Sequence, residues 1–525
     1  MTENQDLPPG WIELEFGDLF SQPGNDIVDG PFGSNLKASE YASAGIPIAR
    51  LQNIDRNRFV AKNIQYVTDE KAEELARHTF VPGDILITKL GDPLGKACLT
   101  PSSIPRGVLV ADVVRARLTH PWVNRHFLSY QINADNIVEQ FKDQTKGTTR
   151  PRVNLTKIRT LKARLCPLPE QTRIVAKLEE LLSDLDAGVA ELKAAQKKLG
   201  QYRQSLLKAA VEGALTAEWR AKNTPSETGA QLLERILLER RARWEAKQFA
   251  KFKEQGKTPP KDWQKKYPEP VQLDTTDLPE LPQGWVWSSL DVLISDGPQN
   301  GIYLPGDRYG VGTPILRIDD YQIGSHRDRA SLNLVDADDA ICKIYSLVSG
   351  DLVINRVNSM THLGKSLLVT KLLNGVLFES NMMRFSLSPL VSGKFFAFYL
   401  GSDIGRTRLI RDAKWAVNQA SINQKDVRRT PVPLASAAEQ IAISAILKDQ
   451  LDAVDQLHMA NDKGLKQSTA QRQNILRAAF TGQLVPQDPN DEPASVLLDR
   501  IRAERVLQEG VKKPRRRKTK ESLHA

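Results

Sequence analysis

The sequence predicts an α+β protein in which two mixed α/β globular domains are joined by two long antiparallel helices, as a pseudo-twofold internal repeat. The main observation is that RQSLLKAAVEGAL at 203–215 returns 269 residues later as RQNILRAAFTGQL at 472–484. Seven of the thirteen positions are identical, where unrelated segments share about one. Two further observations agree: other short motifs recur in the same order, and a heptad-spaced apolar seam precedes each copy.

The other repeated motifs lie on both sides of this segment. The matched pairs are LPPGW at 7–11 with LPQGW at 281–285, GIPIAR at 45–50 with GTPILR at 312–317, GDILI at 83–87 with GDLVI at 350–354, LGK at 94–96 with LGK at 363–365, Glu170-Gln171 with Glu439-Gln440, and LLERI at 232–236 with LLDRI at 497–501. Their order is the same in each half. The chain is therefore predicted to be a duplicated unit, a globular domain followed by a long helix.

These motifs divide the chain, which is too long for one hydrophobic core. We expect a first globular domain at 1–167, a first long helix at 168–216, a charged connector at 217–276, a second globular domain at 277–433, a second long helix at 434–485, and a short helix with a basic tail at 486–525. In the first domain, β-type runs bounded by turn residues predict strands at 46–50, 85–90 and 108–118. Helices are predicted at 68–78 and 122–141, giving a mixed domain with one twisted sheet.

The first long helix carries an apolar seam from Ile174 to Leu206, with spacings that alternate between four and three. Forty-five residues rise about 65 Å, and such a rod needs a partner to bury its seam. The second long helix, which begins at the capping box Ser436-x-x-Glu439, supplies one. Because each helix follows its own domain, antiparallel packing is expected. A coiled-coil spacer without a specific role is the alternative.

The bulk composition favours a polyanionic partner and excludes few classes. The net charge is +10 and the pI about 9.3, which weakly favours nucleic acid. There is no run of eighteen apolar residues and no signal pattern at the N-terminus, so we expect a cytoplasmic protein without membrane contact. Cys98, Cys166 and Cys342 are isolated and are expected to be buried free thiols.

The sequence offers no catalytic motif. LGKS at 363–366 lacks the glycine that a phosphate-binding loop requires, because Ser359 stands in its place. The seven histidines are scattered, and none has metal-ligand spacing. Asp84 and Asp351 recur in both copies but follow glycine, as structural turn residues do. We therefore expect no catalytic residue, no metal and no cofactor in this chain.

Two basic segments lie outside the repeated motifs. In the connector, Trp244 and Phe249 stand among arginines and lysines, a mixture that can follow a phosphate backbone and that a solvated helix face also produces. The tail reads KKPRRRKTK at 512–520. It fits nonspecific nucleic-acid binding or a solubilising role.

With these motifs the chain resembles the specificity subunit of type I restriction–modification enzymes along nearly its whole length. The resemblance rests on the LPPGW and LPQGW openers, the GDILI and GDLVI strands and the helix ends LLKAAVEGAL and ILRAAFTGQL. It implies two target recognition domains that each read half of a bipartite double-stranded DNA site, with the helices setting the gap. It also implies two modification (methyltransferase) subunits docked on the helices, which carry S-adenosylmethionine, and restriction subunits that use ATP and Mg.

Recognition domains need Arg, Asn or Gln for base edges and Lys or Arg for phosphates. The polar residues beside the shared motifs are Ser34, Asn35, Lys37, Arg50, Asn53, Lys89 and Lys96 in the first domain, and Asn300, Tyr303, Arg317, Arg356, Asn358 and Lys365 in the second. Both copies keep a basic residue at Arg50/Arg317 and at Lys89/Arg356, which suits phosphate contact.

Matched residues off the helix seam are candidates for docking two equivalent partner subunits. They are Arg203, Ala209, Ala210, Arg472, Ala478 and Ala479. Two other functions stay open: a sequence-specific DNA-binding regulator that acts alone, and a methyltransferase or nuclease with an unrecognised site. Binding of a methyl donor, or tight binding of DNA without a partner, would distinguish them.

Overall fold

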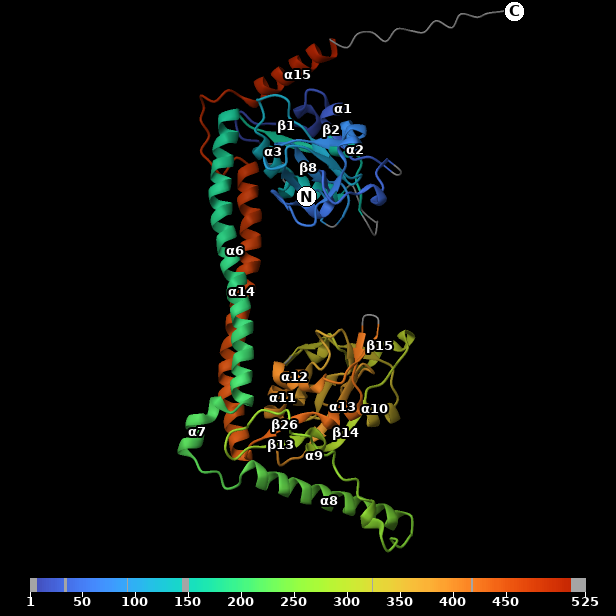
Figure 1. The fold of residues 1–525 in the computed structure, drawn as a ribbon. Helices are drawn as coiled ribbons and strands as arrows, with labels where there is room; N and C mark the ends of the chain where they lie inside the picture. Colours follow the sequence, from blue (N-terminus) through green and yellow to red (C-terminus); the bar gives the residue numbers. More distant parts are fainter. Residues whose placement is uncertain are drawn as a thin grey trace, which may run out of the picture. The chain divides into compact units, whose positions relative to one another are not determined.

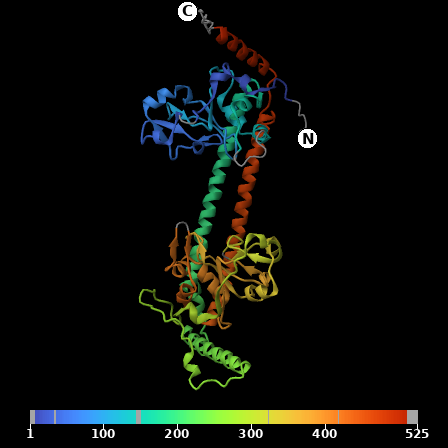
Figure 2. The ribbon, with the colours of Figure 1, turned by 90° about the vertical axis from the view of Figure 1, so that its right-hand side faces the viewer.

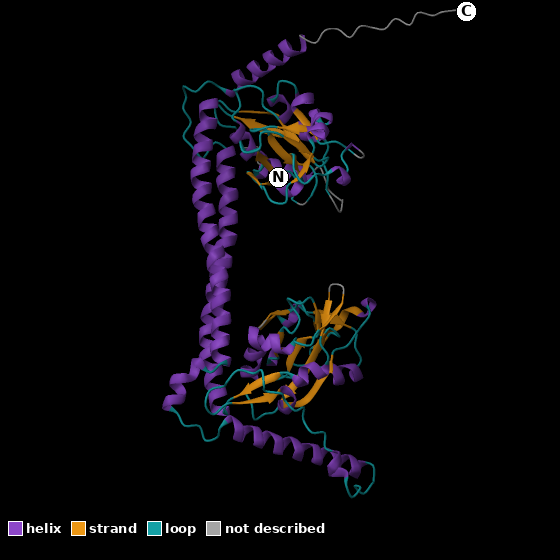
Figure 3. Cartoon of the chain, in the orientation of Figure 1, coloured by secondary structure: helices purple, strands orange, loops and turns teal. Residues whose placement is uncertain are grey.

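The computed structural model describes residues 7–32, 35–91, 93–143, 151–322, 324–416 and 419–510. It divides into two compact units, residues 1–193 with 462–525 and residues 194–461. Each unit contains one sheet-rich domain and segments of both long helices, α6 (Leu168–Val211) and α14 (Ala437–Phe480) (Figures 1 and 3). The mixed α/β character and the two long helices agree with the prediction.

The domain of the first unit holds two four-stranded sheets. Its strands are β1 (Ile12–Glu15), β2 (Ile27–Asp29), β3 (Ile46–Ala49), β4 (Ile54–Asp55), β5 (Arg58–Phe59), β6 (Gln65–Val67), β7 (Thr79–Phe80), β8 (Ile85–Thr88), β9 (Ala97–Leu99), β10 (Gly107–Leu109), β11 (Val113–Ala116) and β12 (Lys162–Leu165). Its helices are α1 (Pro23–Asp26), α2 (Asp69–Glu74), α3 (Arg125–Ile132), α4 (Asp135–Asp143) and α5 (Leu155–Arg159). The sheet orders are β2-β11-β8-β9 and β6-β3-β10-β7, with β1 paired to β12 and β4 to β5.

The domain of the second unit repeats this topology. Its strands are β13 (Val286–Ser289), β14 (Ile294–Asn300), β15 (Tyr309–Leu316), β16 (Tyr321–Gln322), β17 (Ser325–His326), β18 (Asn333–Val335), β19 (Leu352–Asn355), β20 (Val357–Asn358), β21 (Ser366–Leu368), β22 (Leu377–Phe378), β23 (Met382–Leu387), β24 (Lys414–Ala416), β25 (Gln419–Ser421) and β26 (Pro431–Leu434). The orders β14-β23-β19-β21 and β13-β26 match those of the first unit strand for strand, and β18-β15-β22 matches β6-β3-β10 but has no described strand in the place of β7. Both units keep one parallel pair, β3 with β10 and β15 with β22. The sheet β20-β25-β24 has no counterpart among the described residues of the first unit.

The helices of the second unit complete the fold. They are α7 (Ala217–Lys222), α8 (Gly229–Glu254), α9 (Leu290–Leu293), α10 (Asp339–Tyr345), α11 (Gly393–Gly401), α12 (Asp403–Leu409) and α13 (Gln424–Arg429). The last helix of the chain, α15 (Ala494–Gly510), belongs to the first unit. Figure 2 shows α8 and α15 as separate helices beside the sheet-rich domains of their own units.

Three details of the first domain differ from the prediction. The single twisted sheet is two sheets, and the run 108–118 supplies a strand to each, because the chain turns where Val113 N donates to Val110 O at 3.0 Å. The predicted helix 122–141 is two helices. Asn133 lies between them. Its side chain accepts from the backbone N–H of Ala97 in β9 at 3.1 Å and donates to the carbonyl of Ala97 at 2.8 Å. The end of α3 is thus bonded to a strand.

In each unit the segments of α6 and α14 run antiparallel. In the first unit Arg472 forms an ion pair with Asp186, and in the second Arg203 Nη1 lies 2.6 Å from Asp455 Oδ1. The matched residues of the repeat thus exchange partners, as in a two-fold contact. Arg203 and Arg472 were predicted to face partner subunits. Both link α6 to α14, because each arginine lies opposite a carboxylate of the other helix, and their contact with a partner subunit stays a prediction.

The thirteen-residue repeat fills the same position in each unit. The buried residues are Leu207, Ala210 and Val211 beside Trp285 in the second unit, and Leu476, Ala479 and Phe480 beside Trp11 in the first. Ala210 and Ala479 are fully buried, so the prediction that they face a partner subunit is wrong. Ala209 and Ala478 are half-buried, and their role stays a prediction.

A tryptophan and a glutamate close each of these cores. Trp11 Nε1 donates to both oxygens of Glu170 at 3.0 and 3.1 Å, and Trp285 Nε1 donates to Glu439 Oε2 at 2.8 Å. The predicted capping box is therefore half confirmed: Ser436 Oγ accepts from Glu439 N at 3.2 Å, but the glutamate side chain turns to the tryptophan. The repeated openers and the repeated glutamates form one contact.

The glutamine that follows each glutamate joins the long helix to a short helix of the domain. Gln171 accepts from the backbone N–H of Asn124 at 2.7 Å, and Gln440 accepts from that of Ser392 at 2.8 Å. Asn124 and Ser392 are the N-cap residues of α3 and α11. Each Glu-Gln pair therefore positions its long helix against two parts of one domain.

The apolar seam of the helix pair is less buried than predicted. Tyr202 and Leu457 are seam positions by spacing, yet they are 51% and 55% exposed. Seam residues near the domains, such as Ile174, Leu178, Ile443 and Leu447, are buried. Packing against the domains thus buries the seam at its ends, because there each long helix contacts a domain as well as the other helix.

The two glutamates predict a measurable difference between the units. Glu439 also accepts from Thr216 Oγ1 at 2.7 Å and pairs with Arg220 at 2.5 Å. Burial raises the pKa of Glu170, so its charge opposes folding there. We expect Glu439→Gln to lower the local stability of the second unit by about 2 kcal/mol. Glu170→Gln keeps an acceptor for Trp11 and should change the first unit by less than about 0.5 kcal/mol.

Hydrogen exchange followed by mass spectrometry on peptides that cover β1 and β13 would check this, because exchange reports local opening within each unit. Equal acceleration of exchange in the two variants would contradict it.

Candidate DNA interface

The repeated Gly-Asp turns anchor the central sheet of each domain. Asp84 and Asp351 are nearly fully buried. Each accepts a backbone N–H from three residues earlier, at 2.8 and 2.9 Å. Each also pairs with an arginine of the neighbouring strand or its end, Arg117 at 2.7 Å and Arg384 at 3.4 Å. Both carboxylates are therefore structural, as the sequence predicts.

Arg50 and Arg317 begin equivalent turns. The backbone N–H of each arginine donates to a side chain three residues later, at 3.1 Å to Asn53 and at 2.9 Å in the second copy. The guanidinium groups differ: Arg50 Nη2 donates to a backbone carbonyl at 2.6 Å, and Arg317 Nε lies 3.3 Å from Glu379 Oε2. Burial works to lower the pKa of Arg317, and the Glu379 carboxylate outweighs it, so the pKa is raised. Both arginines keep partly exposed side chains.

Asn53 does not fit the DNA-contact prediction. Its side chain is fully buried, and its amide donates to the carbonyls of Val60 and Lys62 at 2.9 and 3.1 Å. The amide is used entirely in holding the turn, so the prediction is wrong for this residue.

Lys89 and Arg356, the second predicted pair, have different surroundings. Lys89 is buried, pairs with Asp29, and its Nζ lies 4.4 Å from the ring centroid of Phe32. The prediction that Lys89 contacts DNA is therefore wrong, because its charge is neutralised inside the domain. Arg356 is half-buried, and its Nη1 donates to Ser380 O at 2.9 Å.

The two LGK lysines also differ. Lys96 is partly exposed and lies 3.4 Å from Asp55. Lys365 is buried, donates to the carbonyls of Ile318 and Tyr321 at 2.6 and 2.7 Å, and burial lowers its pKa. Lys365 therefore does not contact DNA as predicted, because it holds the turn that carries those carbonyls.

The remaining predicted residues lie at or near the surface. Asn35, Lys37, Asn300 and Tyr303 are exposed, Tyr303 by 77%, and Asn358 is half-buried in β20. Ser34 lies outside the described residues. These positions stay predictions for DNA contact.

Two predicted residues meet in a polar hollow of 450 Å³. It is lined by Asn300, Arg356, Asn423, Gln424 and Lys425, from β14, the end of β19 and the start of α13. Asn423 holds the turn by accepting the backbone N–H of Lys425 at 2.8 Å. The lining carries two positive charges and no carboxylate. Its arginine and amide side chains are those that read base edges in the major groove of DNA.

The sequence prediction missed three residues of this hollow and one exposed tryptophan. A signal existed for Asn423, because Asn154 stands 269 residues earlier and caps α5 in the same way, with Lys157 N at 2.9 Å. Trp415, on β24, is 73% exposed. No repeat marks Trp415, since the sheet that holds it has no counterpart among the described residues of the first unit.

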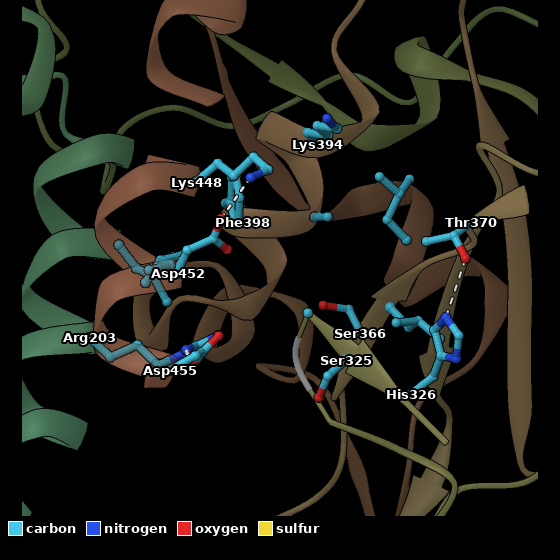
Figure 4. Close-up of a pocket in the computed structure, with 16 residues that line it drawn as sticks. Arg203, Ser325, His326, Ser366, Thr370, Lys394, Phe398, Lys448, Asp452 and Asp455 are labelled. Atoms are coloured by element: carbon cyan, nitrogen blue, oxygen red, sulfur yellow. Dashed lines mark hydrogen bonds and ion pairs between the residues drawn. The ribbon is translucent and has the colours of Figure 1, made fainter. Parts of the chain in front are cut away.

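A second hollow of 510 Å³ lies where α6 and α14 pass the domain of the second unit (Figure 4). Leucines and Phe398 form much of its wall. Its polar side chains largely bond each other, as in the ion pair of Lys448 with Asp452 at 2.6 Å and the contact of His326 with Thr370 at 3.2 Å. This arrangement is typical of a packing gap within a unit, and it is poorly suited to bind DNA.

Other kinds of site receive little support. Among the residues that the structure describes, no group of three or more His, Cys, Asp or Glu side chains is placed to hold a metal ion. No described helix is both long enough and apolar enough to cross a membrane. Cys98 and Cys166 are buried free thiols, as predicted, and burial raises the pKa of Cys98 to about 12. Cys342 is only half-buried.

The chain was compared with models of known protein families. The family model described as the type I restriction modification DNA specificity domain matches residues 107–194. This range runs from β10 into α6 and ends past the middle of that helix. It therefore includes Glu170 and Gln171, which join the domain to the helix.

Several curated relatives match along most of their length. The EcoKI specificity subunit of Escherichia coli strain K12 is 22% identical over 528 residues, covering 97% of this chain and 99% of that protein. The StySPI specificity subunit of Salmonella potsdam is 21% identical, with the same coverage of both proteins. The EcoBI specificity subunit of Escherichia coli is 26% identical and covers 68% of each protein.

A solved structure shares the fold. It comes from work on complex assembly and conformational transition of the type I R-M system, is 18% identical, and superposes with a TM-score of 0.60 over 91% of this chain and 99% of the other. The fold of this chain is therefore one already seen in a solved structure. The family model and these relatives make the chain similar to the DNA specificity subunits of type I restriction–modification systems.

Proposed function

We propose that each unit reads one block of a bipartite double-stranded DNA sequence, and that the chain itself carries no catalytic residue. One observation supports this most: the two domains share a strand order but differ at the equivalent positions Lys89 and Arg356. Lys89 is enclosed by the first domain, whereas Arg356 opens onto a polar hollow. One scaffold with two sets of surface side chains suits the reading of two different short sequences.

The polar hollow of the second unit has the chemistry for base readout. Arginine can donate two hydrogen bonds to guanine, and asparagine or glutamine can form a bidentate pair with adenine. Gln424 and Lys425 project from the first turn of α13, which Asn423 holds in place. Asn300 and Arg356 approach from the sheet. Groups on such firmly held elements can discriminate between bases, because little ordering is needed when DNA binds.

We propose that two methyltransferase subunits dock on α6 and α14 and bring S-adenosylmethionine, and that restriction subunits bring the ATP- and Mg-dependent steps. The exposed apolar side chains on the long helices support docking: Tyr202, Leu457 and Met459 are 51%, 55% and 65% exposed. Apolar surface of this kind is typical of a helix that gains a partner. In this proposal the length of the helices sets the gap between the two DNA blocks.

The test of the function is a map of methylated adenines in the DNA of the source cell, with the gene intact and with it deleted. We expect one bipartite motif, two short blocks around a fixed unspecific gap, to lose methylation on deletion. If no motif changes and the purified chain binds a DNA sequence tightly without partner subunits, the protein is a regulator that acts alone. If the purified chain binds a methyl donor, the non-catalytic role is wrong.

Gln424→Ala is expected to relax specificity in one block only. The side chain lines the polar hollow, and the Asn423 cap stays intact, so α13 should keep its position. Removing one bidentate pair costs about 1–3 kcal/mol of discrimination at one base pair. The methylated-motif map of a strain with this variant would show it. Relaxation in both blocks, or none, would remove Gln424 from the base-reading residues.

Leu457→Ser is expected to weaken docking of the methyltransferase subunit by about 2 kcal/mol if the residue lies at the centre of the interface. The exposed leucine packs little within its own unit, so the chain should keep its stability. Co-purification with the partner, measured as the ratio of subunits, checks this. Val506→Ser on α15, an equally apolar and exposed position, is the matched control and should leave the ratio unchanged.

A further inference from the structure

The helices α8 and α15 are attached to their units in the same way. Each begins with a backbone N–H that donates to a glycine carbonyl of the opener motif: Gly229 N to Gly284 O at 2.7 Å, and Ala494 N to Gly10 O at 2.9 Å. Each then buries a leucine and an isoleucine one turn later. These residues are Leu232 and Ile236 in α8, and Leu497 and Ile501 in α15. Both helices keep contact with their domains beyond these residues.

An arginine and an aspartate strengthen both attachments. Arg240 of α8 lies 3.5 Å from Asp291, and Arg505 of α15 lies 3.6 Å from Asp18. Asp291 is buried and also pairs with Arg428 of α13, the helix whose first turn lines the polar hollow. One carboxylate therefore ties α8 to the helix that carries Gln424 and Lys425.

Residues 240–267, here called the arm, form a helix and a returning segment held together by aromatic rings. Trp244 stacks on Trp263 with ring centroids 5.7 Å apart, and Tyr267 and Phe252 pack edge-on against this pair. These four aromatic residues of the arm are thus engaged with each other. They stabilise the arm and leave its charged side chains to contact a ligand.

The outer part of the arm is a lysine surface. Between residues 247 and 266 there are seven lysines and two carboxylates. Six of these lysines are exposed and form no ion pair with any residue that the structure describes: Lys247, Lys251, Lys253, Lys257, Lys261 and Lys266. The arginines nearer the domain are different, since Arg241 and Arg243 pair with glutamates one turn away.

The sequence after α15 is basic as well. KKPRRRKTK at 512–520 has seven basic residues in nine and lies outside the described residues. Each copy of the repeat therefore attaches a helix to its domain and continues into a strongly basic segment. A solvated helix face alone would not require this pattern twice.

We propose that the arm binds the phosphate backbone of duplex DNA beyond the block that the second unit reads. Unpaired lysines neutralise phosphates without regard to sequence, and the tie through Asp291 joins the arm to the element that lines the polar hollow. The inference rests on the proposed function, because it places backbone contacts next to a base-reading site. In this proposal the arm contributes affinity for DNA that does not depend on sequence, because it contacts phosphates and no bases.

An acidic protein surface is the other ligand that such an arm could bind. Leu238 and Phe249 are 72% and 57% exposed on α8 and would suit a protein. The lysines outnumber these two apolar residues and lie around the outer end of the arm. No arginine, which could bind in a bidentate way, stands among them between residues 247 and 266. This distribution favours binding to a regular array of phosphates over binding to a single complementary protein patch. Lysine ammonium groups act as point charges and can pair with successive phosphates.

The test uses the full-length chain in its complex with the partner subunits, and two duplexes that contain the bipartite motif. One duplex ends at the recognised blocks, and the other continues on both sides with unrelated sequence. We expect the triple variant Lys251→Ala, Lys253→Ala and Lys257→Ala to bind the short duplex like the original protein. On the long duplex, the slope of log affinity against log salt should fall by about 0.9 for each phosphate that the arm no longer neutralises.

The charge-preserving variant Lys251→Arg, Lys253→Arg and Lys257→Arg is the control and should keep the original slope. Unchanged binding of the long duplex by the triple alanine variant would overturn the proposal. Loss of a partner subunit from that variant, with DNA binding intact, would also overturn it and make the arm a protein-binding surface. If the original protein binds neither duplex, the proposed function itself fails, and the arm proposal fails with it.

Discussion

Each unit depends on one buried contact, in which the end of a long helix packs around a hydrogen bond from a tryptophan to a glutamate. In the first unit, the opener residue Trp11, the start of α6 and the end of α14 meet in one core. Residues near both ends of the chain thus stabilise the same domain. The second unit builds the same core from Trp285, the end of α6 and the start of α14. The domains and the long helices therefore cannot be separated without exposing apolar surface.

The two units use this shared scaffold for different surfaces. The Gly-Asp turns, most of the strand order and the Glu-Gln contacts agree between them, and the carboxylates and glutamines of these contacts are buried. The differences lie where loops meet the sheet. Lys89 is enclosed with Asp29, whereas Arg356 borders an open polar hollow. Rigid elements with variable loops are the usual way in which one fold recognises several ligands.

Arginine and lysine have separate roles in this chain. Arg117, Arg384, Arg240 and Arg505 each hold two elements together through a carboxylate, where the planar guanidinium fork favours a fixed geometry. The lysines of the arm lie at the surface without such partners. The net charge of +10 is therefore not all available to a ligand, since arginines such as these four are paired with carboxylates inside the units. The arm is one segment whose exposed lysines are available to a polyanion.

The sequence by itself determined the duplication, the mixed α/β class and the long helices, because these depend on repeats and periodicities that a linear chain records directly. It also singled out Arg356 and Asn300, which stand beside repeated motifs and line one hollow, and their contact with DNA stays a prediction. Only the tertiary structure decided which polar residues are accessible. Asn53, Lys89 and Lys365 are polar residues next to such motifs, yet burial commits them to backbone carbonyls or to a carboxylate. Ala210 and Ala479 fill cores for the same reason: exposure depends on contacts between segments far apart in the chain, and no local pattern contains that information.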